Sequence, residues 1–421
     1  MVKPITAMTH DTDLPQGYKA TALGIIPQEW EVKFLGDLLS RCTNGLTYDV
    51  SITCGIPVTR IETISTGEIN YAKVGYIPNE SGYETFRMQK GDILYSHINS
   101  LSQIGKVAYY KGDQEIYHGM NLLLLRANDC LDKQYLYYTL LTEHMRHMAQ
   151  VIAKPAVNQA SISTSDLKRV KIAVPPLAEQ RKIAEVLRVW DEAIEKQARL
   201  IEKLALRKRG LMQRLLSAKL RLPGFSEPWQ KVKFCELFTK SIKTADPLTK
   251  YEVLSVTKEG IVAQKSYFNK DIASEDTSKY IVVEQGDLAM SGLNFWMGSC
   301  HILTNFNEGI ISPAYKVFKV TEHNNINFIR DFVRSSMFLQ ALQGCSVIGA
   351  SIVRRNLDKE MLYEWTFKIP SLKEQTAIAK VLTAADREIE LAKEKLERLR
   401  RQKRGLMQQL LSSKKRVKIN I

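Results

Sequence analysis

Four short polar segments carry the side chains of this chain that are best suited to reading nucleic-acid bases. Asparagine and glutamine can hydrogen-bond adenine through both polar atoms, and arginine can donate two hydrogen bonds to guanine. Lysine and serine suit phosphate oxygens. Ordinary solvated loops are the alternative interpretation of the same segments. The candidates are Ser96, His97, Asn99, Ser100 and Gln103, then Lys154, Asn158 and Gln159, then Ser291, Asn294 and Trp296, and finally Ser351, Arg354, Arg355 and Asn356.

Motifs of catalysis are absent from the sequence. It has no GxxxxGK[ST] loop, no GxGxxG after a strand, and no Asn-Pro-Pro-Tyr or Asp-Pro-Pro-Tyr run of the kind found in amino-methyltransferases. His144 and His147 lack companion ligands, so solvent-facing or capping roles are favoured over a zinc site. Asp92 and Asp287 each follow a glycine, which favours a turn role over general-base chemistry. We therefore expect a non-catalytic protein without a cofactor or metal of its own.

Length and composition indicate a globular protein of two or three domains. The chain has 421 residues, of which 44% are hydrophobic and 25% are charged. No run of about 18 apolar residues could span a membrane, and the first fifteen residues lack the apolar core of a secretory signal. The six cysteines form no CxxC pair, so a zinc ribbon or a disulfide framework is not expected. A reduced, cytoplasmic protein is the simplest interpretation.

The charge balance favours a polyanionic partner. Lys plus Arg is 60 and Asp plus Glu is 45, a net charge of +15. Nucleic acid fits most simply, although an acidic protein or a membrane surface fits the total equally well. Residues 177–219 hold 11 basic and 6 acidic residues, and residues 372–418 hold 14 and 6, so these two stretches carry +13 of the excess. Any other DNA contact must use a local face.

The chain is a tandem duplication. Residues 174–217 align without a gap with residues 369–412, and 22 of the 44 positions are identical. A weaker sequence similarity, with the same separation of 195 residues, relates residues 91–96 to residues 286–291. Each unit therefore consists of a divergent globular part followed by a nearly invariant segment, which indicates a shared scaffold that carries two different readers.

The invariant segments show the heptad pattern of a coiled coil. Apolar residues recur at alternating steps of four and three, and a helix of about 40 residues is about 60 Å long. Two-fold pairing of the repeats would make the helices antiparallel; two unrelated core helices are the alternative. Gly210 and Gly405 predict a kink or a break. The expected seam consists of Ile183, Leu187, Trp190, Ile194, Ile201, Leu204, Leu211 and Leu215 in one helix, and Ile378, Leu382, Ile389, Leu396, Leu399, Leu406 and Leu410 in the other.

Basic clusters lie near the C-terminal ends of both expected helices, at residues 207–209 and 400–404. Interaction with the helix dipole explains them as well as contact with DNA phosphate or a partner does. The divergent segments, residues 30–174 and 229–369, look mixed. Strand-like runs occupy residues 106–110, 121–125 and 314–320, and helical periodicity covers residues 134–152 and 327–342.

Several motifs resemble those of the type I restriction–modification DNA specificity subunits. The resemblance extends from about Leu14 to Ser412, and Ser371, where the first copy has Pro176, is a minor departure. The motifs are Gly17-Tyr18-Lys19, Leu23-Gly24-Ile25-Ile26-Pro27-Gln28-Glu29-Trp30, Val32-Lys33-Phe34-Leu35-Gly36-Asp37, Pro175-Pro176-Leu177, Glu179-Gln180, Arg209-Gly210-Leu211-Met212-Gln213, Leu222-Pro223-Gly224-Phe225 and Trp229.

This resemblance implies an α+β fold: two mixed α/β target recognition domains joined by two long antiparallel coiled-coil helices, as a pseudo-two-fold tandem repeat. It implies a split, asymmetric target on double-stranded DNA, two modification subunits that bind S-adenosylmethionine and methylate adenine, and restriction subunits that use ATP and Mg²⁺. The expected boundaries are tails at 1–14 and 417–421, recognition domains at 15–174 and 220–369, and helices at 175–219 and 370–416.

Three other interpretations stay open at this point. The first is a DNA-binding adaptor of another bacterial defence system. The second is a coiled-coil interaction scaffold that never touches DNA, and the third is a nuclease with an unrecognised site. A footprint on two half-sites would separate the DNA-reading interpretations from the scaffold.

Overall fold

The computed structural model describes residues 14–418 apart from 158, 247–249, 269–275 and 349–354. The chain divides into two units, each described here by itself. Unit 1 comprises Met1–Lys196 and Leu396–Ile421, and unit 2 comprises Gln197–Lys395. Both boundaries fall inside long helices, so each unit contains a segment of both helices. No helix of the described residues is long and apolar enough to cross a membrane.

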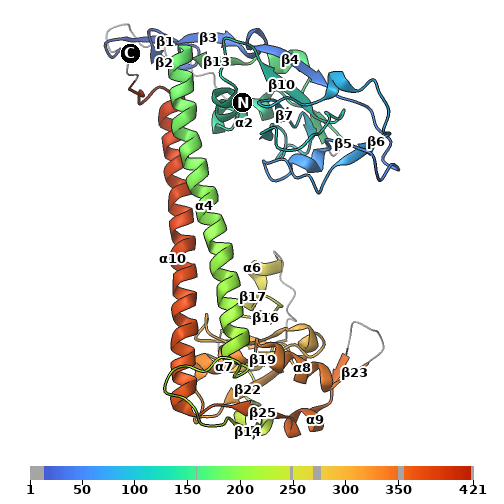
Figure 1. Ribbon diagram of the computed structural model, residues 1–421, viewed down its shortest axis with the longest axis vertical. Helices are drawn as coiled ribbons and strands as arrows, with labels where there is room; N and C mark the ends of the chain where they lie inside the picture. The colour runs from blue at the N-terminus through green and yellow to red at the C-terminus, as the bar shows by residue number, and fades with distance from the viewer. Residues whose placement is uncertain (1–13, 158, 247–249, 269–275, 349–354, 419–421) are drawn as a thin grey trace. The chain divides into compact units, whose positions relative to one another are not determined.

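A four-stranded antiparallel sheet lies at the centre of unit 1 (Figure 1). Alternate residues of its strands enter different apolar clusters: Ile93 and Leu125 pack into one, whereas Leu94 and Leu124 pack into the other. Both faces are therefore buried, which explains why residues 121–125 read as a continuous apolar run. The strand order is β4 (Leu39–Asn44), β10 (Leu123–Ala127), β7 (Ile93–Tyr95) and β9 (Val107–Tyr109).

Unit 2 repeats this sheet with different residues. Leu288 and Met290 pack into one cluster, and Ala289 packs into another, so this sheet is also buried on both faces. The equivalent strand order, again antiparallel, is β15 (Phe238–Lys240), β22 (Lys316–Val320), β19 (Leu288–Met290) and β20 (Cys300–Ile302).

Each predicted helix of the divergent parts is two helices in the structure. Thr142 and Ser335 interrupt the periodicity because each acts as an N-cap whose hydroxyl accepts a backbone N–H three residues later. The helices are α1 (Lys133–Leu140) and α2 (Glu143–Ile152) in unit 1, and α7 (Ile326–Phe332) and α8 (Ser336–Gly344) in unit 2.

Short antiparallel pairings complete both units. In unit 1 they are β1 (Tyr18–Thr21) with β2 (Gly24–Pro27), β3 (Glu31–Phe34) with β13 (Lys171–Val174), β5 (Ile56–Val58) with β6 (Gly75–Ile77), and the sheet β11 (Lys154–Ala156), β12 (Gln159–Ser161) and β8 (Ile98–Asn99). In unit 2 they are β14 (Gln230–Lys233) with β25 (Thr366–Ile369), β16 (Leu254–Val256) with β17 (Ile261–Ala263), β18 (Ile281–Glu284) with β21 (Glu308–Ile311), and β23 (Ser346–Ile348) with β24 (Arg355–Leu357).

The remaining helices are short. They are η2 (Leu35–Leu38), η3 (Ile61–Ile64), η4 (Glu84–Phe86) and α3 (Thr164–Lys168) in unit 1, and α5 (Phe234–Leu237), α6 (Gln264–Phe268), η5 (Phe295–Met297) and α9 (Lys359–Glu364) in unit 2.

Two long helices carry the invariant segments. They are α4 (Leu177–Leu215, 39 residues) and α10 (Leu372–Leu411, 40 residues). Each begins directly after the proline-containing start predicted for it. After each helix a residue takes the left-handed conformation, Ala218 with φ 58° and Ser413 with φ 59°, as at many helix ends.

The break predicted at Gly210 and Gly405 is wrong, because both helices continue through their glycine to residues 215 and 411. A glycine costs a helix about 1 kcal/mol relative to alanine. Leucines one position later, Leu211 and Leu406, pack against the apolar core of their own unit and offset that cost.

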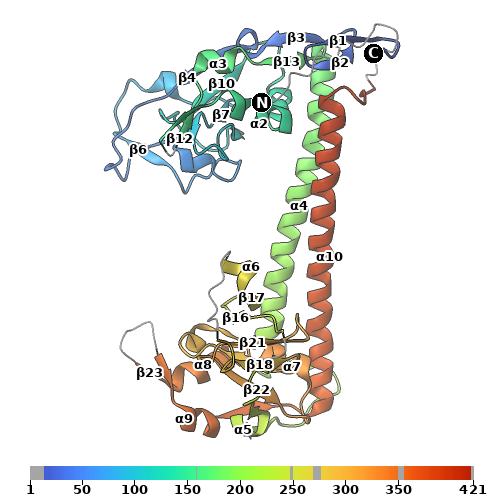
Figure 2. The same ribbon diagram turned by 180° about the vertical axis from the view of Figure 1, so that it is seen from behind.

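The segments of α4 and α10 that belong to the same unit pair with each other. Within each unit the segments of α4 and α10 run side by side in both views (Figures 1 and 2). They are antiparallel, since in unit 1 Glu179 pairs with Arg416 and Asp191 with Lys403. In unit 2, likewise, Lys208 pairs with Asp386 and Arg221 with Glu374. No predicted seam residue is exposed. Ile183, Leu187, Leu204, Leu215, Ile378, Leu382, Leu396 and Leu410 are buried, and Trp190, Ile194, Ile201, Leu211, Ile389, Leu399 and Leu406 are half-buried.

Candidate nucleic-acid interface

In unit 1 the structure brings the first two polar segments onto one small sheet. Strand β12 lies between β11 and β8, and its Ala160 pairs with Asn99. Asn99 is therefore a neighbour of a hairpin more than fifty residues later in the chain, which carries the exposed Lys154 and Gln159. We call Asn99, Ser100, Gln103, Lys154 and Gln159 the unit 1 polar surface. Asn158 lies outside the described residues.

Local hydrogen bonds hold this surface in shape. The Asn99 Oδ1 atom accepts from the Ser100 backbone N–H at 2.8 Å, and the Gln103 N–H donates to the Ser100 carbonyl at 2.9 Å. Lys154 Nζ lies 3.2 Å from Asp166, but its side chain remains 73% exposed, so the ammonium group is accessible to a phosphate.

Ser96 and His97 were predicted to contact DNA, but both are buried, at 1% and 5% exposure. Ser96 Oγ accepts from Asn99 Nδ2 at 3.2 Å. Burial lowers the pKa of His97 to about 4, which keeps the ring neutral. These positions favour a role in supporting the loop rather than in touching a base.

The third and fourth segments meet in unit 2 through a side-chain contact rather than through strand pairing. The Arg355 guanidinium carbon lies 4.3 Å from the centre of the Trp296 ring, and Arg355 Nη1 donates to Ser346 Oγ at 3.0 Å. Gln343 also donates to the Trp296 carbonyl at 3.3 Å. Stacking and tethering fix the arginine before any ligand binds, which lowers the entropy lost on binding.

The other unit 2 candidates divide by exposure. Asn294 and Asn356 are exposed, whereas Ser291 is buried and its Oγ accepts from the Asn294 N–H at 3.1 Å. We call Asn294, Trp296, Arg355 and Asn356 the unit 2 polar surface. Ser351 and Arg354 lie outside the described residues.

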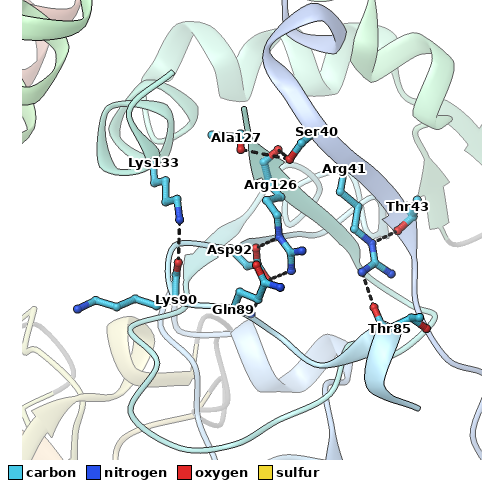
Figure 3. A network of polar contacts seen from close by, with 10 residues as sticks. All are labelled: Ser40, Arg41, Thr43, Thr85, Gln89, Lys90, Asp92, Arg126, Ala127 and Lys133. Carbon is cyan, nitrogen blue, oxygen red and sulfur yellow. Dashed lines mark hydrogen bonds and ion pairs between the residues drawn. The ribbon is translucent and has the colours of Figure 1, made fainter. Parts of the chain in front are cut away.

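Asp92 has the turn role predicted for it. Figure 3 shows its carboxylate between the Gln89 N–H, which donates at 2.7 Å, and Arg126, whose Nε and Nη2 atoms donate at 2.7 and 2.8 Å. Gly91 precedes it with φ +99°, a conformation that favours glycine. The same network contains Arg41, which donates to Thr85 and Thr43. Asp92 is therefore committed to structure.

Asp287 occupies the equivalent turn of unit 2, but its ion pair is longer than that of Asp92. Its carboxylate accepts from the Glu284 N–H at 3.0 Å, and Lys319 Nζ lies 3.6 Å away. Lys319 also contacts the Glu284 carboxylate at 2.8 Å, which Lys243 shares. Hydrogen bonds from these two lysines lower the pKa of Glu284 to about 2. Both turns thus use their aspartate to hold two strands.

The part of the chain that the structure describes forms neither a metal cluster nor a disulfide. Among the described residues no group of three or more His, Cys, Asp or Glu side chains could hold a metal ion. All six cysteines are free. His144 lines a surface hollow of unit 1 rather than a ligand set.

A Trp–Glu–Arg cluster around a buried carboxylate joins the two helix ends of unit 1. Glu179, in the first turn of α4, accepts from Trp30 Nε1 at 3.0 Å and from two nitrogens of Arg416 at 2.8 Å each. Arg416 follows the end of α10, so a single carboxylate connects the globular part of unit 1, the start of one helix and the end of the other.

Unit 2 builds the same cluster from its own residues. Glu374 accepts from Trp229 Nε1 at 3.1 Å and from Arg221 Nε and Nη2 at 2.6 and 2.8 Å. Arg221 also lies 5.9 Å from the centre of the Trp229 ring. The next residue in each helix repeats as well: the Oε1 atoms of Gln180 and Gln375 accept from the N-cap N–H groups of α1 and α7.

The sequence reasoning did not identify the six tryptophan, glutamate and arginine residues of these two clusters as sites. Glu179 and Glu374 stand in the repeated motif, and Arg221 and Arg416 are separated by the same 195 residues as that motif, just beyond its gapless stretch. The repeat offset could therefore have paired the arginines. Nothing local in the sequence indicates which carboxylate they meet.

A lysine replaces an apolar residue at the same seam position of each helix. Lys208 Nζ lies 2.5 Å from Asp386 and 3.7 Å from the fully buried Asp331, which Arg330 also contacts at 2.8 Å. In unit 1, Lys403 Nζ lies 2.5 Å from Asp191 and over the Tyr138 ring. Buried charges of this kind specify register, because a shifted helix would leave them unpaired.

Comparisons with known proteins agree with this architecture. Residues 27–205 and 226–401 each match the family described as type I restriction modification DNA specificity domain. The chain is 33% identical over 436 residues to a specificity subunit assigned to the type I restriction enzyme MjaX of Methanocaldococcus jannaschii, covering 96% of this chain and 97% of that protein.

Solved structures show the same fold. A chain from a structure of type I R-M complex assembly and conformational transition is similar with a TM-score of 0.56 at 15% identity, covering 92% of this chain and 98% of that one. The type I restriction-modification S subunit from M. genitalium is similar with a TM-score of 0.50 at 16% identity, covering 91% and 96%.

Proposed function

Because the chain belongs to the type I restriction–modification DNA specificity family, we propose that it reads a split, asymmetric sequence on double-stranded DNA, with one half-site read by each unit. The observation that carries this proposal is the convergence in each unit of two polar segments that are far apart in sequence. The unit 1 polar surface presents amides and an ammonium group, whereas the unit 2 polar surface presents a stacked arginine and two asparagines. Different donors and acceptors suit different bases, which makes the target asymmetric.

The hydrogen bonds that these side chains can form indicate which bases each half-site would contain. Arg355 suits guanine, since a guanidinium can donate to both O6 and N7, and Asn99, Gln159, Asn294 and Asn356 suit adenine. Lys154 suits a phosphate at the edge of the first half-site. Base contacts would supply specificity and the basic helices would add salt-dependent affinity.

The paired helices would set the distance between the half-sites and bind the other subunits of the complex. Two observations support this role of the helices: both are unbroken, and a Trp–Glu–Arg cluster fixes the helix ends in each unit. A two-fold repeated scaffold offers two equivalent surfaces, which suits two copies of a modification subunit. Restriction subunits would join the same complex in the cytoplasm.

Catalysis would belong to those partners. S-adenosylmethionine would be bound by the modification subunits, and ATP and Mg²⁺ by the restriction subunits. This chain would determine where adenine is methylated or DNA is cut, without bonding to the reacting atoms. Purified chain that cleaved DNA alone in the presence of magnesium would contradict this division.

The direct test is a DNase footprint of the complex on its methylated target. We expect two protected half-sites separated by an unread gap, with affinity that falls steeply as salt rises. Arg355→Ala should cost about 1–3 kcal/mol and relax one position of one half-site. Lys154→Ala should weaken all sequences alike. Continuous protection, or none, would favour the interaction scaffold that does not touch DNA.

A further inference from the structure

A cavity of about 600 Å³ opens in unit 1 between the end of α10, the start of α2 and strand β13. Its volume is in the range of sites that enclose a small molecule or the side chains of a docked peptide. The proposed DNA surface does not include it. Its apolar lining includes Ile26, Leu141, Met145, Ile172, Met407 and Leu411.

The equivalent region of unit 2 is filled with aromatic rings. Aligning the N-caps of α1 with α7 and of α2 with α8 places Thr139 opposite Phe332 and Met145 opposite Phe338. Aligning β13 with β25 likewise places Ile172 opposite Phe367.

These three phenylalanines contact one another with ring centres 5.3 to 5.6 Å apart, and each is at most 1% exposed. Unit 1 therefore has smaller side chains at three positions where unit 2 supplies its own aromatic packing. An occupant with an apolar, preferably aromatic, group would give unit 1 the contacts that unit 2 already has.

The charges around the cavity define the rest of the occupant. Lys171, Arg404 and Lys414 line it, and among the described residues that line it Glu143 supplies the carboxylate. Among the described residues, an adjoining hollow shares Lys171 and adds Arg169, besides Lys154 of the unit 1 polar surface, which pairs with Asp166 there. A cationic rim over an apolar floor attracts carboxylates next to a buried apolar side chain. Nucleic acid would leave that floor without a partner.

We propose that this cavity is a docking site for a segment of a partner protein that inserts a large apolar side chain flanked by aspartate or glutamate. The inference deepens the proposed function and rests on it, since a specificity subunit works in a complex with other subunits. It gives unit 1 a contact that unit 2 cannot make, because Phe332, Phe338 and Phe367 already occupy the corresponding space. The partner would thereby distinguish the two ends of a nearly symmetric scaffold.

The test is selection of a random-peptide library, displayed on phage, against the full chain. We expect the enriched peptides to share a Phe, Trp or Leu beside acidic residues. Thr139→Phe, which imitates unit 2, should weaken their binding about tenfold or more. Arg404→Glu combined with Lys414→Glu should do the same through the exposed rim. Thr383→Phe adds a phenylalanine at an exposed position of α10 and should leave binding unchanged.

Failure to enrich any such motif would overturn the proposal, as would undiminished binding to a folded Thr139→Phe chain. If circular dichroism shows that Thr139→Phe does not fold, the rim variant decides, and unchanged binding by it overturns the proposal. The DNase footprint is measured on the same preparations. A missing two-part footprint counts against DNA reading, whereas a normal footprint without peptide binding counts against the docking site alone.

Discussion

The helix ends of the two units are built alike, whereas their recognition surfaces are not. Glu179 and Glu374 each accept from one tryptophan and one arginine with nearly the same distances. The central sheets of both units have the same strand order, and the two polar surfaces share one asparagine at the repeat offset, Asn99 and Asn294. Their other described side chains differ, and the arginine stacked on a tryptophan belongs to the unit 2 polar surface. The difference indicates which parts perform a common task and which parts discriminate.

Duplicated contacts in the scaffold require that both units hold their helices with the same geometry. Substitutions in the polar surfaces then cost little stability, because each central sheet is held by apolar cores on both of its faces. Variation of a reader would not disturb the scaffold, and a change to the scaffold would affect both readers.

The largest expected effect comes from placing a charge in the seam. Leu204→Asp should destabilise unit 2 by about 4 kcal/mol, because a carboxylate would replace a buried leucine. The equivalent Leu399→Asp in unit 1 should cost about half as much, since Leu399 is half-buried. Amide hydrogen exchange, which reports each unit separately, would check both, and equal losses would contradict the difference in packing.

The next effect compares the two buried carboxylates. Glu374→Ala should destabilise unit 2 by about 3 kcal/mol, because it leaves the partly buried Arg221 without a carboxylate partner. Glu179→Ala should cost unit 1 about 2 kcal/mol, since the Arg416 side chain is 36% exposed and water can solvate it. Urea unfolding followed by exchange would measure both. A larger loss for Glu179→Ala would break the comparison.

A smaller effect separates two neighbouring residues of α4. Lys208→Ala should cost about 2 kcal/mol, because it removes a cation from the buried Asp331 and from Asp386. Arg207→Ala, whose partner Glu388 is equally exposed, should cost at most about 0.5 kcal/mol. Thermal unfolding of the two variants beside the unchanged chain provides the measurement. Similar shifts would mean that burial does not decide the value of these pairs.

The seam could be predicted from sequence because its signal is periodic. Eight of the ten expected positions in the first helix and nine of the ten in the second are apolar, and the structure buries or half-buries all of them. The glycine break was wrong because intrinsic propensity at Gly210 and Gly405 is outweighed by the packing of the leucines that follow. Burial depends on contacts that a local pattern does not contain.

The smallest expected effect is the difference between the two units in how their stability depends on pH. Little of it appears at neutral pH, and it grows as the solution is acidified. Burial lowers the pKa of His97 and His118 in unit 1 to about 4, and also lowers that of His301 in unit 2. The neutral rings are favoured in the folded state, so their contribution is complete above an unfolded pKa of about 6.5 and is lost as pH falls toward 4.

Unit 1 should therefore lose more stability than unit 2 between these pH values. His97→Asn combined with His118→Asn should flatten the unit 1 profile, and hydrogen exchange across that pH range would record it. A profile that the double variant does not alter would contradict this assignment.

The candidate interface was only partly readable from sequence. Asn99, Gln159 and Arg355 were selected for the hydrogen bonds that their residue types can form. The structure brings the segments of Asn99 and Gln159 together in unit 1, and those of Arg355 and Trp296 together in unit 2. The same reasoning selected Ser96 and His97, which the fold buries. Exposure at the end of a short strand depends on tertiary packing, so polarity alone could not separate supporting residues from accessible ones. Their contacts with DNA stay predictions.

The most direct test of separate reading by the two units is methylome sequencing after a segment exchange. Residues 30–174 would be replaced by the corresponding segment of another family member, in a strain that carries the partner subunits. We predict that one half of the methylated sequence changes, while the other half and the gap stay as they were. A change in both halves, or in neither, would contradict the account.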